Sequence, residues 1–337
     1  MSNSQIVSAM DKAATPQTFA IIIVNYNGGE RLERCFQSLS RQTRMPDRIV
    51  LVDNNSDNFS ATQTQTDFPQ IEIVPLQENV GFAAANNLAV KKLDDVEWIA
   101  LLNPDAYAEP HWLETVMHAV VEHPECSFFG SRMQTMEEKG LGGTGDVYHV
   151  SGASWRRDHG KSAERRKQSD EIISPSGAAA LYRRDIYLEA EGMNEDFFCY
   201  MEDIDLGIKL QSLGHRCCYI SNAIVIHEGS ALVGKYSDFQ VYHGHRNMVW
   251  VYVMNMPGPW LWIYLPQHIL YNVATILLFI YRGQARVILQ AKIDAIKGLA
   301  RAWRQRKAIQ ANARVNARIL RSRMKHGVLA PYLNRHE

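Results

Sequence analysis

The sequence has few of the features that mark secreted, disulfide-rich proteins. It holds five cysteines in 337 residues and no Cys-x-x-Cys pair. Their odd number argues against a closed disulfide framework, and a reducing cytoplasm is the simplest compartment. The first 18 residues are mixed and polar and lack the apolar stretch of a signal peptide. We therefore expect a disordered leader at residues 1–18 and no export.

The sequence also lacks an excess of either charge, because 36 basic and 36 acidic residues cancel. This balance hides an uneven distribution. Residues 282–337 hold fourteen Lys and Arg against two acidic residues, which leaves 22 basic and 34 acidic residues in the rest of the chain. The pattern predicts an acidic globule with a basic carboxyl-terminal tail.

A long unbroken hydrophobic run is missing as well. Residues 250–281 are rich in Trp, Tyr, Leu and Ile, but prolines and polar residues interrupt them. The unbroken apolar pieces are too short to predict a spanning helix, which needs about 20 mostly apolar residues. Further along, apolar residues recur every three or four positions among many Lys and Arg: Leu289, Ile293, Ile296, Leu299 and Trp303. This spacing is typical of an interfacial amphipathic helix.

The sequence does contain apolar, β-branched runs that alternate with segments of helical periodicity. Strand-like runs lie at residues 19–24, 48–53, 71–75 and 98–103, and helical segments follow near residues 32–39, 81–91 and 110–123. Alternation of this kind predicts an α/β fold with a mostly parallel sheet and helices on both faces.

The regular pattern stops between residues 132 and 173, which we interpret as a long mobile loop. Order resumes with helices near residues 183–190 and 202–213 and short strands at 217–219 and 224–226. We expect one nucleotide-binding domain over residues 19–237, followed by a helical, basic region over residues 238–337.

Acidic turns follow two of the predicted strands. Asp53 ends the second strand and Asp105 follows the fourth, where an open α/β sheet presents groups to a ligand. Asp53 is placed to accept hydrogen bonds from a nucleoside, and Asp105 to hold a divalent cation such as Mg²⁺ or Mn²⁺. Either residue alone could equally cap a helix or close a turn. Their joint placement favours ligand binding.

A second group of candidate residues lies further along the chain. Glu202 and Asp203 begin a predicted helix after an aromatic run, where the helix dipole stabilises a carboxylate that can act as a general base. Ordinary helix capping is the alternative. His227, at a strand end, could complete a metal shell through an imidazole nitrogen, although a single histidine there is more often structural.

Six motifs, in this order, resemble the inverting GT-A glycosyltransferases of family 2, and within them the bacterial rhamnosyltransferase-like branch. They lie at residues 22–27 (IIVNYN), 52–57 (VDNNSD), 79–87 (NVGFAAANN), 102–105 (LNPD), 176–178 (SGA) and 201–206 (MEDIDL). The resemblance covers roughly residues 19–250. Several motifs in the right order make it much more specific than any one of them.

The resemblance implies transfer of a sugar from a nucleoside diphosphate to an acceptor hydroxyl with inversion. It implies a role at the donor nucleotide for Val24, Tyr26, Asp53, Gly81, Asn86 and Asn103. Asp105 would bind the metal that bridges the diphosphate, and Asp203, beside Glu202, would be the base. Arg246 resembles a family element near the donor phosphates.

The chain departs from the family pattern at the metal-binding element. The usual DxD reads Asn103-Pro104-Asp105 here, so a single carboxylate would need help from His227. The QxxRW element of processive members is absent, which favours addition of one sugar per encounter.

These observations predict a metal-dependent, peripheral membrane enzyme. We expect it to transfer L-rhamnose from dTDP-rhamnose to a polyprenyl-diphosphate-linked glycan of the bacterial envelope, at the cytoplasmic face of the inner membrane. The basic tail would bind an anionic leaflet, each basic residue adding about 1 kcal/mol. A solvated helical extension or a contact in a homo-oligomer is the alternative for the tail. The acidic globule argues against nucleic acid.

Two other functions remain open from the sequence. One is a UDP-hexose or UDP-N-acetylhexosamine transferase of the same fold, and the other is a non-catalytic scaffold that binds sugar nucleotides at the membrane. A dinucleotide oxidoreductase is disfavoured because residues 25–30 lack the GxGxxG spacing.

Overall fold

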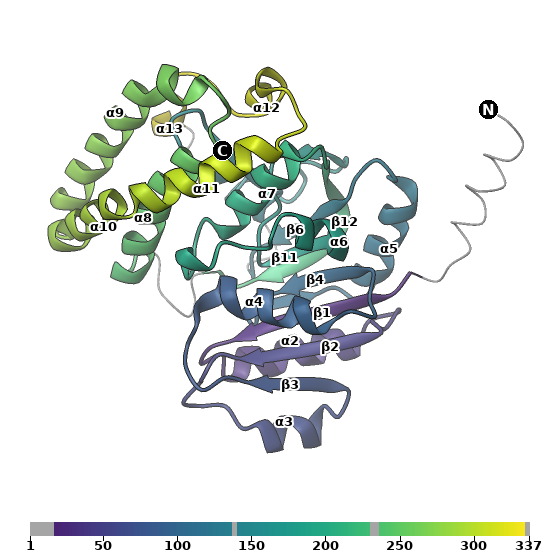
Figure 1. Ribbon diagram of the computed structural model, residues 1–337. Coiled ribbons are helices and arrows are strands. Elements are labelled where there is room, and N and C mark those ends of the chain that lie inside the picture. The colour runs from purple at the N-terminus through teal and green to yellow at the C-terminus, as the bar shows by residue number, and fades with distance from the viewer. Residues whose placement is uncertain (1–16, 137–139, 230–235, 334–337) are drawn as a thin grey trace, which may run out of the picture.

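The computed structural model describes residues 17–136, 140–229 and 236–333 (Figure 1). Apart from its last two residues, the predicted leader at residues 1–18 lies outside the described residues. Within them, a central sheet with flanking helices is followed by a helical region.

A ten-stranded sheet forms the centre of the first domain, and the order along its main path is β10-β12-β6-β11-β4-β1-β2-β3. Its strands are β1 (Phe19–Asn25), β2 (Arg48–Asp53), β3 (Ile71–Pro75), β4 (Trp98–Leu102), β5 (Ala106–Ala108), β6 (Phe128–Gln134), β7 (Leu141–Gly143), β10 (Asp170–Ile172), β11 (Ala179–Arg183) and β12 (Cys217–His227). Strands β4, β1, β2 and β3 are parallel, as predicted. Beyond β4 the antiparallel strand β11 makes the sheet mixed.

Helices cover both faces of this sheet, which confirms the predicted α/β architecture (Figure 1). The helices are α2 (Glu30–Ser40), α3 (Ala61–Asp67), α4 (Gly81–Lys92), α5 (Trp112–Glu122), α6 (Arg184–Glu189) and α7 (Glu202–Ser212). Alternate β1 side chains point to opposite faces. Ile21 and Ile23 join the core under α2 and α5, whereas Ile22 and Val24 join the core under α4, α6 and α7.

The prediction of a mobile loop over residues 132–173 was wrong for the described part of that segment. Strands β7 and β10 join the main sheet, and β8 (Asp146–Tyr148) pairs with β9 (Ser154–Arg156). Arg157 Nη1 lies 2.7 Å from Asp170 Oδ2, and Arg166 Nε lies 2.6 Å from Asp158 Oδ2. Ion pairs and very short strands hold this segment, and neither produces the apolar periodicity on which the prediction depended.

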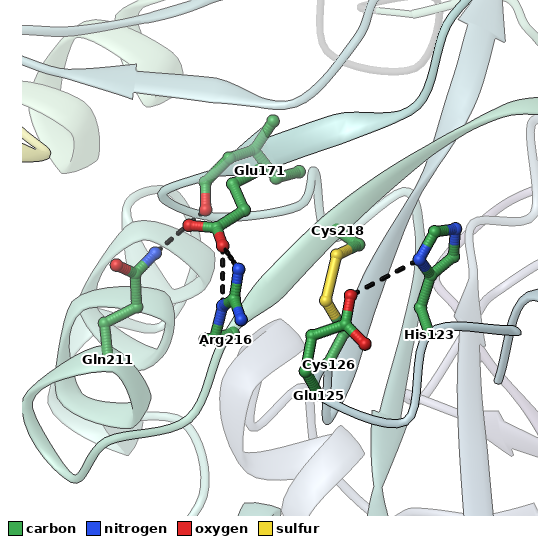
Figure 2. The surroundings of a disulfide bond; sticks show 8 residues. His123, Glu125, Cys126, Glu171, Gln211, Arg216 and Cys218 are labelled. Carbon is green, nitrogen blue, oxygen red and sulfur yellow. Dashed lines mark hydrogen bonds and ion pairs between the residues drawn. A yellow bond between two sulfur atoms is a disulfide. The ribbon is translucent and has the colours of Figure 1, made fainter.

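A disulfide joins Cys126 and Cys218 at the amino ends of β6 and β12 (Figure 2). Their Cα atoms are 6.1 Å apart. The cysteine count did not indicate this pair, and the other three cysteines are free. The odd number of cysteines argued against a framework in which every cysteine is paired. One bridge between two neighbouring strands is a local link and not such a framework. It lies at the edge of the sheet opposite the carboxyl ends of the parallel strands.

The helical region shares a core with the first domain. Its helices are α8 (Asp238–Asn255), α9 (Trp260–Tyr281), α10 (Ala285–Lys297), α11 (Leu299–Asn312), α12 (Ala317–Ser322) and α13 (Ala330–Leu333). Ser237 caps α8 by accepting a hydrogen bond from the Gln240 N–H. One apolar cluster combines Phe197 and Ile204 with Trp250. The boundary predicted after residue 237 thus falls at a helix start, but the core extends across it.

Helix α9 runs without a break through Pro266. Among the described residues it is the one helix that is long and apolar enough to cross a membrane, judged by length and composition alone. The apolar spacing over residues 289–303 is divided between α10 and α11, which meet at Gly298. A Cβ at Gly298 would lie 2.5 Å from the Trp250 ring, so this close contact requires glycine.

Candidate active site

The predicted nucleoside-binding residues lie at the carboxyl ends of β1 and β2. Asn25 stands opposite Asp53 in the parallel register. Oδ1 of Asp53 accepts hydrogen bonds from Asn25 Nδ2 at 2.8 Å and from Ser56 Oγ at 2.7 Å. Val24 is buried, whereas Tyr26 is 48% exposed. The Asp53 carboxylate is therefore fixed in place beside an exposed aromatic ring.

Gly81 begins α4 against the segment that precedes Glu202. Its φ is +86°, and a Cβ there would lie 2.6 Å from the Phe198 carbonyl oxygen. That oxygen accepts a hydrogen bond from the Phe82 N–H at 2.7 Å. Glycine is required for this approach. Asn86, also predicted to border the nucleotide, is buried and donates to the Phe82 carbonyl within its own helix.

Asp105 and His227, far apart in the sequence, lie together in the structure. Strand β12 pairs antiparallel with β5, which sets His227 opposite Ala106. His227 Nε2 is 3.2 Å from Asp105 Oδ1, and both side chains are buried. Burial acts to raise the pKa of Asp105, but the hydrogen bond and charge of His227 together hold that pKa below its usual value.

Asn103, two residues before Asp105, offers a further atom that can bind a divalent cation. Asn103 Oδ1 is buried and has no hydrogen-bond partner within the described part of the chain. A carboxylate oxygen, an imidazole nitrogen and an amide oxygen can all coordinate such an ion, with diphosphate oxygens filling the remaining positions. Mg²⁺ and Mn²⁺ are both suited by oxygen ligands, so the carboxylate and amide oxygens fit either ion and the imidazole does not select between them.

Asp203 is held at the first turn of α7 by backbone donors. The Gly177 N–H donates to Oδ2 at 3.1 Å, and the Ile204 N–H donates to Oδ1 at 2.8 Å. Burial raises the pKa of Asp203, whereas these two hydrogen bonds and the charge of Arg156 act in the opposite direction.

Glu202 differs from its neighbour in its surroundings. Its side chain is buried, and Oε2 has no hydrogen-bond partner among the residues described. Burial, together with the negative charge of Asp203, raises the pKa of Glu202 well above its usual value. Asp203, whose carboxylate accepts two backbone hydrogen bonds, is therefore the stronger candidate for a base.

The loop that leads into Glu202 has a strained backbone. Positive φ angles occur at Phe198, Tyr200 and Met201, at 66°, 69° and 74°. Asn247 Nδ2, from α8, donates to three carbonyls of this segment, those of Phe197 at 3.0 Å, Cys199 at 3.0 Å and Tyr200 at 2.8 Å. Such conformations persist only where surrounding contacts hold them. The helical region thus positions residues 198–201, which we call the catalytic loop.

Arg246, predicted to lie near the donor phosphates, contacts the segment before the catalytic loop. Its Nη2 donates to the carbonyls of Asp196 at 3.1 Å and Phe197 at 3.0 Å. Its guanidinium also lies over the Trp250 ring, 4.6 Å from the centroid. These contacts support the base of the loop, and a role for Arg246 at the phosphates stays a prediction.

Two charged residues near the site were missed by the sequence reasoning, because they belong to the β8–β9 hairpin that we had interpreted as a loop. A Cβ at Gly229 would lie 3.8 Å from Arg156 Nη1 and 3.7 Å from His227 Nδ1, so the guanidinium and the imidazole flank one glycine. Asp146 is buried, and burial, followed by the charge of Asp203, raises its pKa well above the usual value. No motif marked either residue.

The mixed sheet with helices on both faces, with Asp53, Asp105 and His227 at its carboxyl edge, has the arrangement of the GT-A glycosyltransferase fold. The family model for glycosyl transferase family 2 matches residues 20–189, half of the chain, and the chain belongs to this family.

Several curated bacterial proteins are similar in sequence. N-acetylglucosaminyl-diphospho-decaprenol L-rhamnosyltransferase of Mycobacterium tuberculosis is 25% identical over 64% of this chain and 77% of the relative. The O-antigen chain rhamnosyltransferase RfbN of Salmonella typhimurium is 22% identical over 66% of this chain and 71% of the relative.

Solved structures share the fold at low sequence identity. TarS 1-349 of S. aureus in complex with UDP-GlcNAc aligns with a TM-score of 0.56 and 16% identity, over 91% of each chain. GalNAc-T7 with UDP, GalNAc and Mn²⁺ aligns with a TM-score of 0.59 and 14% identity, over 71% of this chain and 48% of that one. These likenesses establish the GT-A fold of the first domain.

Proposed function

We propose that this glycosyltransferase moves one L-rhamnose from dTDP-rhamnose to a polyprenyl-diphosphate-linked glycan, with inversion at the anomeric carbon. The donor and the lipid-linked acceptor are supported by the M. tuberculosis relative, whose name specifies a rhamnosyl transfer and a decaprenol-linked substrate. We place the reaction at the cytoplasmic face of the bacterial inner membrane, where such an acceptor would be met.

The observation that carries the proposal is the pair of sites at the same edge of the sheet. Asp105 and His227 are 3.2 Å apart just beyond β4, and Asp203 accepts a hydrogen bond from the N–H of Gly177, which precedes β11, the strand beside β4. An inverting transfer needs a group that stabilises the leaving diphosphate and a base on the opposite face of the sugar.

In the proposed reaction, Asp203 removes the proton of the acceptor hydroxyl as that oxygen forms a bond to the anomeric carbon. The bond between the anomeric carbon and the phosphate oxygen breaks, and the nucleoside diphosphate leaves with the electron pair. Asp53 would hold the pyrimidine, with Val24 and Tyr26 beside the base. General-base assistance of this kind contributes roughly 10²–10⁴-fold.

Asp105 and His227 would hold a divalent ion, with Asn103 nearby. When bound, Mn²⁺ or Mg²⁺ would neutralise charge that develops on the diphosphate.

A panel of nucleotide sugars tests the proposal. The chain is incubated with each donor and Mn²⁺ or Mg²⁺, and then with EDTA, and nucleoside diphosphate release is measured. We expect release from dTDP-rhamnose that EDTA abolishes. Preference for a UDP-hexose or UDP-N-acetylhexosamine would replace the donor and keep the reaction class.

Two aspartate variants test the base. Asp203→Asn should lower kcat by at least about 10²-fold. Asp94→Asn makes the same chemical change at an exposed position that follows α4 and precedes β4, and it should retain wild-type kcat. Full activity of Asp203→Asn would contradict the base assignment. Nucleotide binding without turnover of any donor, with a lipid-linked acceptor present, would favour the non-catalytic scaffold.

A further inference from the structure

The outer face of α9 is apolar although the helix lies on the surface of the protein. Its exposed side chains are Trp262, Ile263, Pro266, Ile269, Leu270, Val273, Leu277, Ile280 and Tyr281. None of them is charged, and α9 contains no Lys, Arg, Asp or Glu. Soluble monomers rarely expose a continuous apolar surface of this kind, and such surfaces mark sites of interaction with a protein or a membrane.

Helix α10 extends the same surface. It packs against α9 and exposes Leu289, Ile293 and Ile296. We call the exposed apolar side chains of α9 and α10 together the docking face. Figure 1 shows both helices at the outer side of the helical region, away from the central sheet.

The inner face of α9 carries a few polar groups among apolar side chains, and these polar groups bond within the protein. His268 Nδ1 is 2.7 Å from the Ser151 carbonyl oxygen, and its ring stacks on Tyr252 at 3.9 Å between centroids. Asn272 Oδ1 accepts a hydrogen bond from Lys292 Nζ at 2.6 Å. A helix that left this bundle to cross a bilayer would take His268 and Asn272 into hydrocarbon, where an unsatisfied polar group costs several kcal/mol.

A cleft between α8, α9 and α11 opens beside the docking face. Its volume is about 470 Å³, and its walls are apolar. They include Leu261, Trp262 and Leu265 of α9 and Leu299 and Trp303 of α11. The rings of Trp262 and Trp303 are 6.0 Å apart. A cleft with no polar wall suits a hydrocarbon chain.

The charges around the docking face indicate what kind of partner would bind there. The exposed basic residues of this region include Arg282, Arg286, Lys297, Arg304 and Lys307. The one acidic side chain between residues 282 and 333 is Asp294, which already pairs with Lys297 at 3.0 Å. A symmetric dimer through this face would bring basic rims together, which is unfavourable. An anionic lipid surface complements them.

We propose that α9 lies along the surface of an anionic bilayer, with the docking face in the acyl region and both ends of the helix on the same side of the membrane. This proposal deepens the proposed function, because it supplies the surface on which a lipid-linked acceptor would be met. The helix would enter the bilayer to a depth of about 5–10 Å. Its inner polar groups would stay bound to the protein.

Vesicle flotation tests the docking face. The full chain should float with vesicles that contain phosphatidylglycerol and phosphatidylcholine, and much less with phosphatidylcholine alone. Leu277→Glu and Ile296→Glu change residues that are 62% and 66% exposed, and each should weaken binding at least about tenfold, or about 1.4 kcal/mol. Val121→Glu is the matched control, because Val121 of α5 is 64% exposed on the first domain; it should float like wild type.

Two fusions of the full chain test whether α9 crosses the membrane. Carboxyl-terminal green fluorescent protein should fluoresce in bacterial cells and carboxyl-terminal alkaline phosphatase should be inactive, because both ends of α9 stay in the cytoplasm. An active phosphatase fusion would show that α9 spans the membrane and would overturn the proposal.

Other outcomes separate this proposal from the proposed function. Wild-type flotation by Leu277→Glu and Ile296→Glu would overturn the docking face. So would a chain that dimerises through this face and does not float. Donor hydrolysis by the wild-type chain without vesicles tests the glycosyltransferase function alone. A chain that hydrolyses the donor but does not float refutes the docking face only.

Discussion

Asn247 offers a sharp test of how the helical region supports catalysis. Its side-chain amide holds three carbonyls of the strained segment that leads into Glu202 and Asp203. Asn247→Leu keeps a side chain of similar size but removes both N–H donors. Two N–H groups serve these three carbonyls, and each hydrogen bond lost to a buried carbonyl costs about 1–3 kcal/mol, so the loss of both donors should destabilise the local structure of the loop by about 2–6 kcal/mol.

The expected result is a loss of turnover with nucleotide binding retained. A misplacement of the base by about 1 Å can cost about 10²-fold in rate, whereas Asp53 and its partner Asn25 lie on β2 and β1. Among the hydrogen bonds of the described residues, none joins these two residues to Asn247. The assay compares kcat for donor turnover with the Kd of the nucleoside diphosphate from titration calorimetry. Asn312→Leu, the same change at an exposed residue at the end of α11, is the control.

Wild-type kcat in Asn247→Leu would refute the reasoning. So would an equal loss of kcat in Asn312→Leu, because the effect would then not depend on the loop. A thermal unfolding curve for each variant separates local loss of the loop from global unfolding.

Three further predictions follow from the site. The charge of Arg156 acts to lower the pKa of Asp203, so Arg156→Gln should raise that pKa and move the acid limb of the kcat/KM profile to higher pH. An unmoved limb would contradict this electrostatic influence of Arg156 on Asp203. Gly81→Ala places a Cβ 2.6 Å from the Phe198 carbonyl oxygen at a φ of +86°. It should lower the free energy of unfolding, measured with urea, by about 1–3 kcal/mol. An unchanged free energy of unfolding would argue against this geometry. His227→Ala should raise the Mn²⁺ concentration for half-maximal activity at least about tenfold, with activity recovered at excess Mn²⁺, and an unchanged metal requirement would remove His227 from the metal site.

The parts of the fold that follow hydrophobic periodicity were predictable. Strand β1 was recognisable as an unbroken apolar, β-branched run and helix α2 by apolar residues at helical spacing. Residues at the ends of β2 and β4 could be placed at one edge of the sheet from the sequence. Asp105 and Asp203 were found because strand ends and helix starts of such sheets bind ligands. Both residues could be singled out as candidates because a strand end and a helix start can be recognised from the neighbouring sequence.

The remaining features depend on contacts between distant residues. Arg157 and Asp170 order the hairpin segment through an ion pair, and charged residues in a long irregular stretch look the same whether they pair or face water. Arg156 comes near His227 only because that hairpin folds back. The prolines and polar residues of segment 260–281 argued against one long helix in the sequence. In the structure, His268 and Asn272 of α9 face the protein and bond to it.

The spacing of the Asp105–His227 pair is set by backbone pairing between β5 and β12. The chain that joins these strands, residues 109–216, therefore does not determine the distance between the two side chains. Insertions or deletions in the surface turns of that connection can therefore leave the pair unchanged, provided that β6, which pairs with β12, and Asp203 keep their places. A shift of one residue in the β5–β12 register, in contrast, would turn His227 to the other face of the sheet. Diversification of this enzyme should therefore be tolerated in the lengths of those turns and resisted in the alignment of the two strands.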